Sequence, residues 1–257
     1  MAWSEAQLFD WLARFVWPLL RVGGFYIAMP VFSSHSIPMR VRVILAVMTT
    51  VAVMPLVPQM PALEMLDLSA ALIAVREILI GVAIGFLLQM AFAALVFAGQ
   101  NIAYSMGLGF AALLDPQLGV QVPIISQVYL LLATLLFLGL DGHLALIELL
   151  AASFQSLPPV LGELNRDDLW LMARWGASVF SAGVLLSLPI VIALLFTNIA
   201  LGIATRAAPQ LNIFSVGFPI TLLLGLVLIW STLPMVLQRF AADLPVTYQL
   251  IRQLLKL

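Results

Sequence analysis

The sequence predicts an all-α, polytopic membrane protein built from broken apolar helices and helical hairpins. Of its 257 residues, 63% are hydrophobic and only 9% are charged, whereas soluble domains are about 25% charged. The few charges leave uncharged runs long enough for membrane helices, which need ~20 apolar residues to cross the hydrocarbon core. Prolines and glycines interrupt these runs, which predicts that the helices are broken.

Hydropathy predicts six candidate spans along the chain. In order, they cover residues 15–32, 43–58, 72–98, 127–152, 177–205 and 214–237. The more hydrophilic stretch 158–170 predicts a loop between the fourth span and the fifth. The prolines inside or at the ends of the apolar runs are Pro30, Pro55, Pro189, Pro219 and Pro234. Broken backbone at membrane depth is stable only where protein or a water-filled cavity surrounds it, so we expect neighbouring subunits to cover this chain.

The fourth span carries its own interruption. Gly139 and Gly142 flank Asp141 and leave apolar arms of about a dozen residues, each too short to cross a membrane alone. This pattern is typical of a re-entrant hairpin, with Asp141 and His143 at its tip.

Small and polar residues recur at every fourth position of the third span. This helix-packing set is Glu77, Gly81, Gly85 and Gln89, and Gly217, Thr221 and Gly225 repeat the spacing later. Such faces let helices approach closely, and polar side chains on them form hydrogen bonds across the contact. The sequence leaves open whether these faces pack within this chain or against another subunit.

The segment 107–123 is apolar but unusually rich in glycine and proline. It holds three glycines, two prolines and a single carboxylate, that of Asp115. Asp115 followed by Pro116 is typical of an N-cap and the first position of a helix. The segment is too interrupted for a spanning helix and too apolar for an ordinary surface loop.

The sequence offers little for catalysis. It has no cysteine, and its only two histidines, His35 and His143, lie far apart in the chain, so we expect no metal site. Neither a nucleotide-binding loop nor a nucleophilic serine motif is present, and we predict no cofactor and no enzymatic activity. A net charge of −1 gives no reason to expect nucleic acid as a partner.

A proton-coupled carrier is the alternative function. Carriers use broken helices, and Asp115, Asp141 and Glu148 could form a proton relay. Against this interpretation, carriers are usually built from two related halves, and the sequence shows no internal repeat.

Four stretches resemble the FliR family of the flagellar type III secretion export gate, which has related subunits in injectisomes. They are LLRVGGFYIAMPVFSSHSIPMRVRV (19–43), REILIGVAIGF (76–86), AGQNIAYSMGLGFAALLDPQLGVQVPIISQ (98–127) and ALGIATRAAPQLNIFSVGFPI (200–220). The resemblance runs nearly end to end, in order and at suitable spacing. One departure lies in LGLDGH (138–143), where the family leads us to expect asparagine at Asp141.

The resemblance implies a non-enzymatic channel subunit of the bacterial inner membrane, in the flagellar basal body. Its partners would be FliP and FliQ in the core complex, FlhB and FlhA in the gate, unfolded flagellar export substrates, and membrane lipid. Residues 1–175 would be FliP-like, and residues 176–257 would form a FliQ-like helical hairpin with an amphipathic C-terminal tail, together one membrane unit. Much of such a complex lies outside the membrane plane, so the six spans need not be six crossings.

The resemblance also implies roles for two sets of residues. Residues 106–122 correspond to a plug loop that closes the export channel, and a simple buried loop is the alternative. The plug set is Met106, Gly107, Leu108, Gly109, Phe110, Leu113, Leu114, Asp115, Pro116 and Gly119.

A turn between two helices forms the second set. Its members are Arg206, Pro209, Asn212, Phe214, Gly217 and Pro219. Pro209 should end the preceding helix near Ala208. Arg206 would then serve either the helix end or a contact between subunits.

Overall fold

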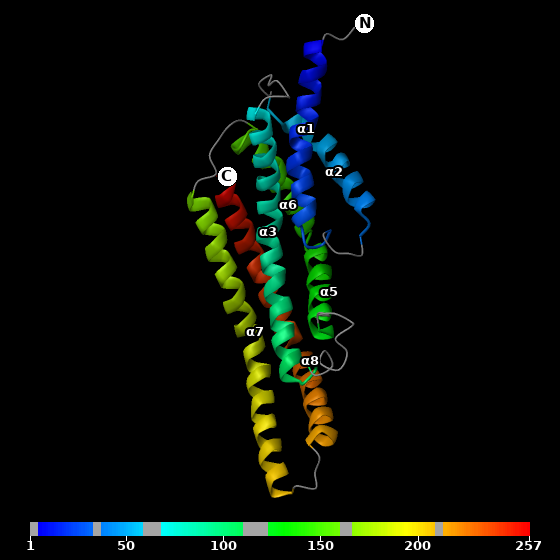
Figure 1. Ribbon diagram of the computed structural model, residues 1–257, viewed down its shortest axis with the longest axis vertical. Coiled ribbons are helices and arrows are strands. Elements are labelled where there is room, and N and C mark those ends of the chain that lie inside the picture. Colours follow the sequence, from blue (N-terminus) through cyan, green and yellow to red (C-terminus); the bar gives the residue numbers. More distant parts are fainter. Residues whose placement is uncertain (1–4, 33–36, 59–67, 110–122, 160–165, 209–212) are drawn as a thin grey trace. The chain divides into compact units, whose positions relative to one another are not determined.

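The computed structural model describes residues 5–32, 37–58, 68–109, 123–159, 166–208 and 213–257, and in these ranges the regular structure is helical throughout (Figure 1). The α-helices are α1 (Glu5–Ala28), α2 (Met39–Val53), α3 (Leu68–Ser105), α5 (Ile124–Gly139), α6 (Gly142–Ser156), α7 (Arg166–Ala207) and α8 (Ile213–Leu254). A short 3-10 helix, η1 (Met54–Leu56), follows α2 directly. The predicted all-α class is confirmed.

Within the described ranges, the six predicted spans reduce to four helical segments that are long and apolar enough to cross a membrane. These are Met39–Leu56, Leu68–Ser105, Trp170–Ala207 and Val216–Leu254, and α5 with α6 counts as a fifth if the two form one broken span. The predicted first span, 15–32, falls on α1, which ends at Ala28, carries Arg14 and Arg21, and is not among these segments.

The long helices are less broken than the sequence predicts. Pro189 lies inside α7, and α8 continues through Pro219 and Pro234. Membrane helices accommodate proline because neighbouring groups and local adjustments satisfy the freed backbone carbonyl. The end of the predicted loop 158–170 is helical, because α7 already begins at Arg166. Asp167 and Asp168 lie in its first turn, where carboxylates favour a helix N-terminus.

Helix length limits what the bilayer can cover. At 1.5 Å per residue, α3 is ~57 Å long and α7 and α8 are each ~63 Å long, about twice the ~30 Å of the hydrocarbon core. The arms α5 and α6, at ~22–24 Å, are each too short to cross alone.

The chain divides into two compact units, each discontinuous in sequence. The first comprises residues 1–90, 140–175 and 244–257, and the second comprises residues 91–139 and 176–243. The division at residue 175 into FliP-like and FliQ-like parts, which the resemblance implies, remains a prediction.

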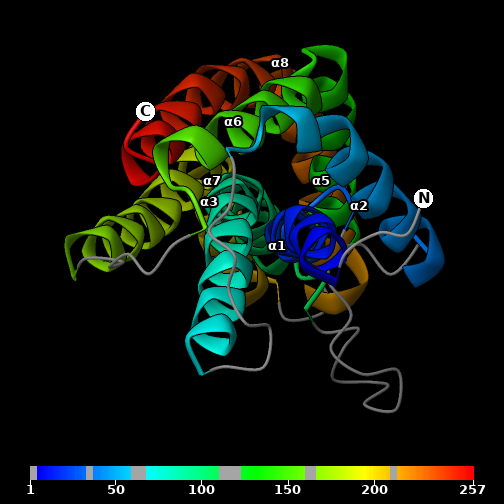
Figure 2. The same ribbon diagram turned by 90° about the horizontal axis from the view of Figure 1, so that it is seen from above.

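In the first unit, α1 lies beside the N-terminal part of α3 and beside α2 (Figures 1 and 2). The α1–α3 contact buries Ala13 and Trp17 of α1 with Ala70 and Ile73 of α3. The end of α8 belongs to the same unit. There Leu244, Thr247, Ile251 and Leu254 are buried at helical spacing while Arg252 is exposed, so this stretch is amphipathic.

The second unit has an aromatic core. Phe92 of α3 packs edge to face against Phe137 of α5 and Phe240 of α8, with ring centroids 5.7 and 5.0 Å apart. Outside this core, Phe97 of α3 and Phe180 of α7, which is 63% exposed, form a third such pair at 5.5 Å. Edge-to-face pairs add about 0.5–1.5 kcal/mol each to the burial of their area, which fixes α3 against its neighbours.

Candidate functional site

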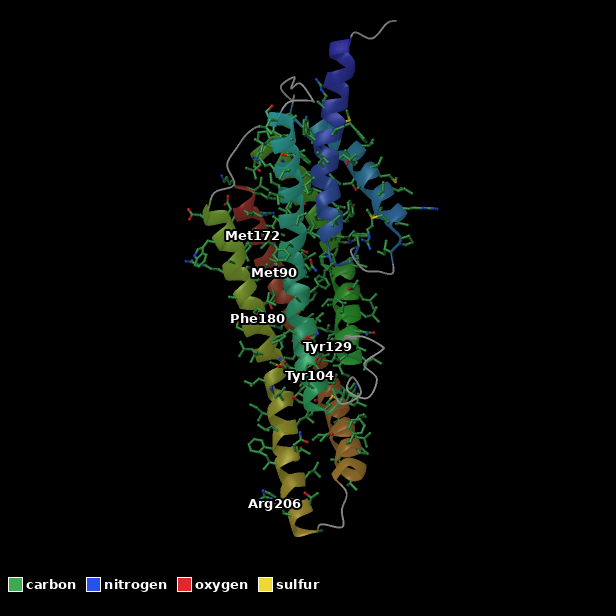
Figure 3. All side chains as sticks on the ribbon, in the orientation of Figure 1. Met90, Tyr104, Tyr129, Met172, Phe180 and Arg206 are labelled. Atoms are coloured by element: carbon green, nitrogen blue, oxygen red, sulfur yellow. The ribbon has the colours of Figure 1, made fainter. Side chains whose placement is uncertain are left out.

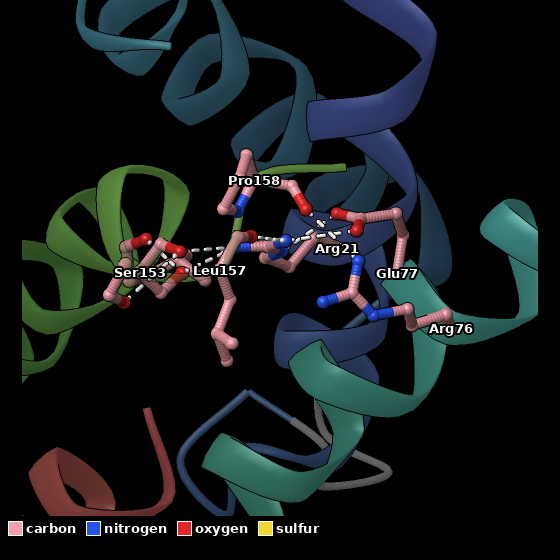
Figure 4. Close-up of polar contacts among 8 residues, drawn as sticks. Arg21, Arg76, Glu77, Ser153, Leu157 and Pro158 are labelled. Atoms are coloured by element: carbon pink, nitrogen blue, oxygen red, sulfur yellow. Dashed lines mark hydrogen bonds and ion pairs between the residues drawn. The ribbon is translucent and has the colours of Figure 1, made fainter. Parts of the chain in front are cut away.

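An ion pair without solvent exposure joins α1 and α3. The Nε and Nη2 atoms of Arg21 donate hydrogen bonds of 2.7 and 2.9 Å to the two carboxylate oxygens of Glu77 (Figure 4). Both side chains have 0% relative exposure. A charge in such a place is stable only when it is paired and its remaining hydrogen-bonding groups are satisfied.

Helix α6 and Leu157, the residue that follows it, supply the remaining acceptors for Arg21. Its Nη1 atom donates to the carbonyl oxygen and the hydroxyl of Ser153, at 2.8 and 2.9 Å, and Nη2 donates to the carbonyl oxygen of Leu157 at 2.6 Å. The guanidinium carbon also lies 4.3 Å from the ring centroid of Phe154. All five N–H donors of Arg21 therefore have acceptors. This cluster of Arg21, Glu77, Ser153 and Leu157 ties three helices together.

Arg21 also donates hydrogen bonds to carbonyl groups at the C-terminal end of α6. The last carbonyls of a helix have no partner within the helix, and a cation there is favourable. Arg76, next to Glu77 in sequence, donates to the carbonyl oxygen of Pro158 at 3.0 Å, just beyond the same helix end. Two arginines of different helices thus hold the C-terminal end of α6.

Glycines make the α1–α3 approach possible. A Cβ atom added at Gly81 would collide with the backbone carbonyl oxygen of Arg21, and one at Gly85 would lie 2.8 Å from the Cβ of Ala28. On the facing helix, a Cβ at Gly24 would lie 2.6 Å from the carbonyl oxygen of Ile78. Glu77, Gly81 and Gly85 of the helix-packing set are therefore used inside the chain. Gln89, the fourth member, is exposed, and its role stays a prediction.

The structure describes the first four residues of the plug set, which lie at the end of α3. Gly107 has a φ of 86°, a left-handed conformation that favours glycine. Its N–H donates to the carbonyl of Tyr104 at 3.0 Å, and the N–H of Leu108 donates to that of Ala103 at 3.0 Å. These two bonds form a Schellman motif, which satisfies the final carbonyls of the helix.

Burial falls sharply across this cap. Met106 is only 1% exposed, whereas Leu108 and Gly109 are half-buried and the nearby Tyr104 is 57% exposed (Figure 3). The other plug residues lie outside the described residues, namely Phe110, Leu113, Leu114, Asp115, Pro116 and Gly119.

The described residues of the second set lie at the end of α7 and near the start of α8. Arg206 is exposed in the last turn of α7 (Figure 3), which ends at Ala207, so the predicted helix end is confirmed. Gly217 is buried and Pro219 is exposed on α8, and the backbone of Phe214 lies in the first turn of that helix. Pro209 and Asn212 lie outside the described residues.

The carboxylates of the predicted carrier relay are not gathered in a buried place. Asp141, which precedes α6 in a left-handed conformation (φ 55°), and Glu148 are both exposed. Asp115 lies outside the described residues. Among the side chains that the structure does describe, no three of the His, Asp and Glu type are grouped to hold a metal ion.

Sequence reasoning missed the partnership of Arg21 with Glu77 and Ser153. A signal was present, because Arg21 is the only charged residue in the predicted span 15–32 and Glu77 lies near the start of the span 72–98. Ionisable residues inside apolar segments pair with one another more often than they face lipid. The acceptors on α6 had no signal in the sequence, because they are mainly backbone carbonyls.

Comparisons with known proteins match almost the whole chain. The model of a family described as bacterial export proteins, family 1, matches residues 12–245. The chain is 40% identical over 233 residues to the flagellar biosynthetic protein FliR of Escherichia coli (strain K12), which covers 91% of this chain and 89% of that protein. It is 38% identical over 236 residues to FliR of Pectobacterium carotovorum subsp. carotovorum (92% and 90%). It is 29% identical over 226 residues to FliR of Bacillus subtilis (strain 168), with 87% of each covered. The chain therefore belongs to the bacterial export proteins of family 1, together with the FliR proteins.

Proposed function

We propose that this chain is a non-enzymatic channel subunit of the flagellar type III export gate. It resides in the inner membrane at the flagellar basal body, assembles with FliP and FliQ, and adjoins FlhB and FlhA. Unfolded flagellar proteins pass through the assembled channel. The observation that carries this proposal is the family match over residues 12–245, with relatives named for flagellar biosynthesis at up to 40% identity.

The surface of the long helices supports an assembly. On α7, exposed apolar side chains extend from Trp170 (59% exposed) through Phe196 (69%) to Ile203 (65%). A bilayer core covers only about 20 residues of a helix, so lipid cannot cover this whole stretch. Trp230 of α8 is 79% exposed. Large exposed apolar patches mark interaction surfaces, and partner subunits would cover what the lipid leaves.

Co-purification is the direct test. The chain carries an affinity tag and is expressed with untagged FliP and FliQ, and membranes are dissolved in mild detergent. We expect a stable complex that contains all three proteins and survives gel filtration. The matched control is the tagged chain expressed without FliP, which should yield no complex of that size. Isolation of the chain as a monomer in the presence of both partners would contradict the proposal.

The segment 106–122 acts, on this proposal, as the plug of the closed channel. Its apolar side chains exclude water and thereby block ions, without attracting charged stretches of the passing chain. Shortening residues 107–119 should leave the complex assembled but make the membrane leak ions. Conductance across membranes that hold the whole complex measures this, and a tight membrane with the shortened segment contradicts the assignment.

Gly109 offers a finer test of the plug. A Cβ there would lie 2.9 Å from Cδ1 of Tyr104, and valine also restricts the backbone because it is β-branched. We expect Gly109→Val to slow secretion of flagellar proteins while the complex remains intact. Adding Tyr104→Ala removes the ring contact but not the backbone restriction. Full rescue by Tyr104→Ala would therefore assign the effect to the ring and not to stiffening of the segment.

A further inference from the structure

The carbonyl group of Met106 is held by α8. Met106 follows the last residue of α3, where backbone carbonyls have no helical partner. The hydroxyl of Thr221 lies 3.3 Å from this carbonyl oxygen and 3.0 Å from that of Phe218 in its own helix, so one proton serves both acceptors. Thr221 is 5% exposed, and the contact is closed to water.

The side chain of Met106 fills the space beside Gly225. A Cβ atom added at Gly225 would lie 2.6 Å from Cγ of Met106 and 2.7 Å from both Sδ and Cε. Those atoms occupy the place that any other residue at position 225 would need. Gly217, Thr221 and Gly225 are all buried, one turn apart on α8, and the thioether of Met106 packs at Gly225, where there is no side chain.

We propose that Thr221 and Gly225 form a seat that keeps Met106, and with it the end of α3, fixed on α8 while protein passes through the channel. This rests on the proposed function, because it makes the three residues positioning residues for the start of the segment 106–122. The side chain of Met106 is buried, its carbonyl is hydrogen-bonded, and the left-handed Gly107 follows directly. The chain therefore leaves α3 at one defined point.

A pair of cysteines tests whether the seat stays closed. The chain contains no cysteine. Cγ of Met106 lies 2.6 Å from a Cβ atom added at Gly225, and the sulfur of a cysteine at position 106 would replace this Cγ, which places the two cysteines within reach of a disulfide. Met106→Cys with Gly225→Cys, in the purified complex, should crosslink under a thiol oxidant about tenfold faster than Met106→Cys with Gly202→Cys. Gly202 is the control because no atom lies within 4 Å of a Cβ added there.

The deciding measurement is secretion by cells that carry the crosslinked chain. We expect cells with the crosslinked pair to secrete flagellar proteins as fast as the same cells under a reductant, and their resting membranes to leak no more when the pair is oxidised. Loss of secretion on oxidation, restored by a reductant, would show that the seat must open and would overturn the proposal. Failure of the pair to crosslink would overturn it as well. Secretion that continues unchanged in cells that lack this chain altogether would refute the proposed function instead.

A second set of variants perturbs the seat without cysteines. Gly225→Ala should displace Met106 and raise the resting ion leak about fivefold or more, whereas Gly202→Ala should leave it unchanged. Met106→Ala added to Gly225→Ala removes the collision and should lower the leak again. Equal effects of Gly225→Ala and Gly202→Ala, or no relief in the double variant, would contradict the seat.

Discussion

Gly24 of α1 faces the backbone of Ile78 of α3 so closely that an added Cβ would lie 2.6 Å from the carbonyl oxygen. Its neighbour Gly23 has no atom within 4 Å of the same position. Two consecutive glycines therefore have different reasons to be glycine. The first keeps two helices in contact, and the second has no steric requirement.

This difference predicts opposite effects of the same substitution. Gly24→Ala should destabilise the protein by ~1–3 kcal/mol, because backbone must move to admit the methyl group. Gly23→Ala should be neutral or stabilise it by up to ~1 kcal/mol, because alanine favours a helix over glycine. The measurement is the thermal unfolding midpoint of the complex in detergent. Equal midpoints for the two variants would contradict the close contact.

The buried ion pair predicts a strong asymmetry between single and double variants. Arg21→Ala or Glu77→Ala leaves an uncompensated buried charge and should destabilise the protein by ~3–5 kcal/mol. Arg21→Met combined with Glu77→Leu removes both charges and should destabilise it by less than either single change.

An exposed ion pair is the matched control for the buried one. Arg239 and Asp243 of α8 lie 3.3 Å apart, and the side chain of Arg239 is 64% exposed. Arg239→Ala should therefore change stability by no more than ~1 kcal/mol. A double variant at Arg21 and Glu77 that is as unstable as the sum of its singles would mean that the two charges are not coupled.

The left-handed conformation of Gly107 predicts which residues can replace it. Alanine there should destabilise the end of α3 by ~1–2 kcal/mol, whereas asparagine, which adopts this conformation more readily, should be tolerated better. The measurement is hydrogen exchange at the amides of Gly107 and Leu108, which donate the two capping bonds. Equal protection in the alanine and asparagine variants would argue against the capping role.

Substitutions can distinguish the two roles proposed for Arg206, at the end of α7 or in a contact between subunits. We expect Arg206→Ala to lower the recovery of FliP and FliQ with the tagged chain. Arg206→Lys keeps a cation at the end of α7, so it should restore recovery if the helix end is what matters and fail if another subunit binds the guanidinium. Arg174→Ala, near the other end of the same helix, is the control. Unchanged recovery with Arg206→Ala rejects the assembly role.

Local signals in the sequence predicted where helices end. The glycines around Asp141 marked the break between α5 and α6, and the end of α7 at Ala207 precedes Pro209 by two residues. Such signals act over a few residues, which is why they can be recognised without a structure.

The features that the sequence did not predict depend on tertiary contacts. Whether a proline breaks a helix depends on what surrounds it, and α7 runs unbroken through Pro189. The every-fourth-residue pattern of Gly81 and Gly85 predicted close packing but not its partner, which is α1 of the same chain. Only the folded chain brings Arg21 to Ser153, 132 residues further on.

The hydrogen-bond acceptors of Arg21 determine when α1 can complete its packing during biosynthesis. Glu77 is made 56 residues after Arg21, and Leu157 is made 136 residues after it. At about 5–20 residues per second, the ribosome reaches Glu77 ~3–11 s after Arg21 and Leu157 ~7–27 s after it. Helix α1 therefore emerges with a guanidinium that has no native partner, and it cannot reach its final packing until the first 157 residues have been translated.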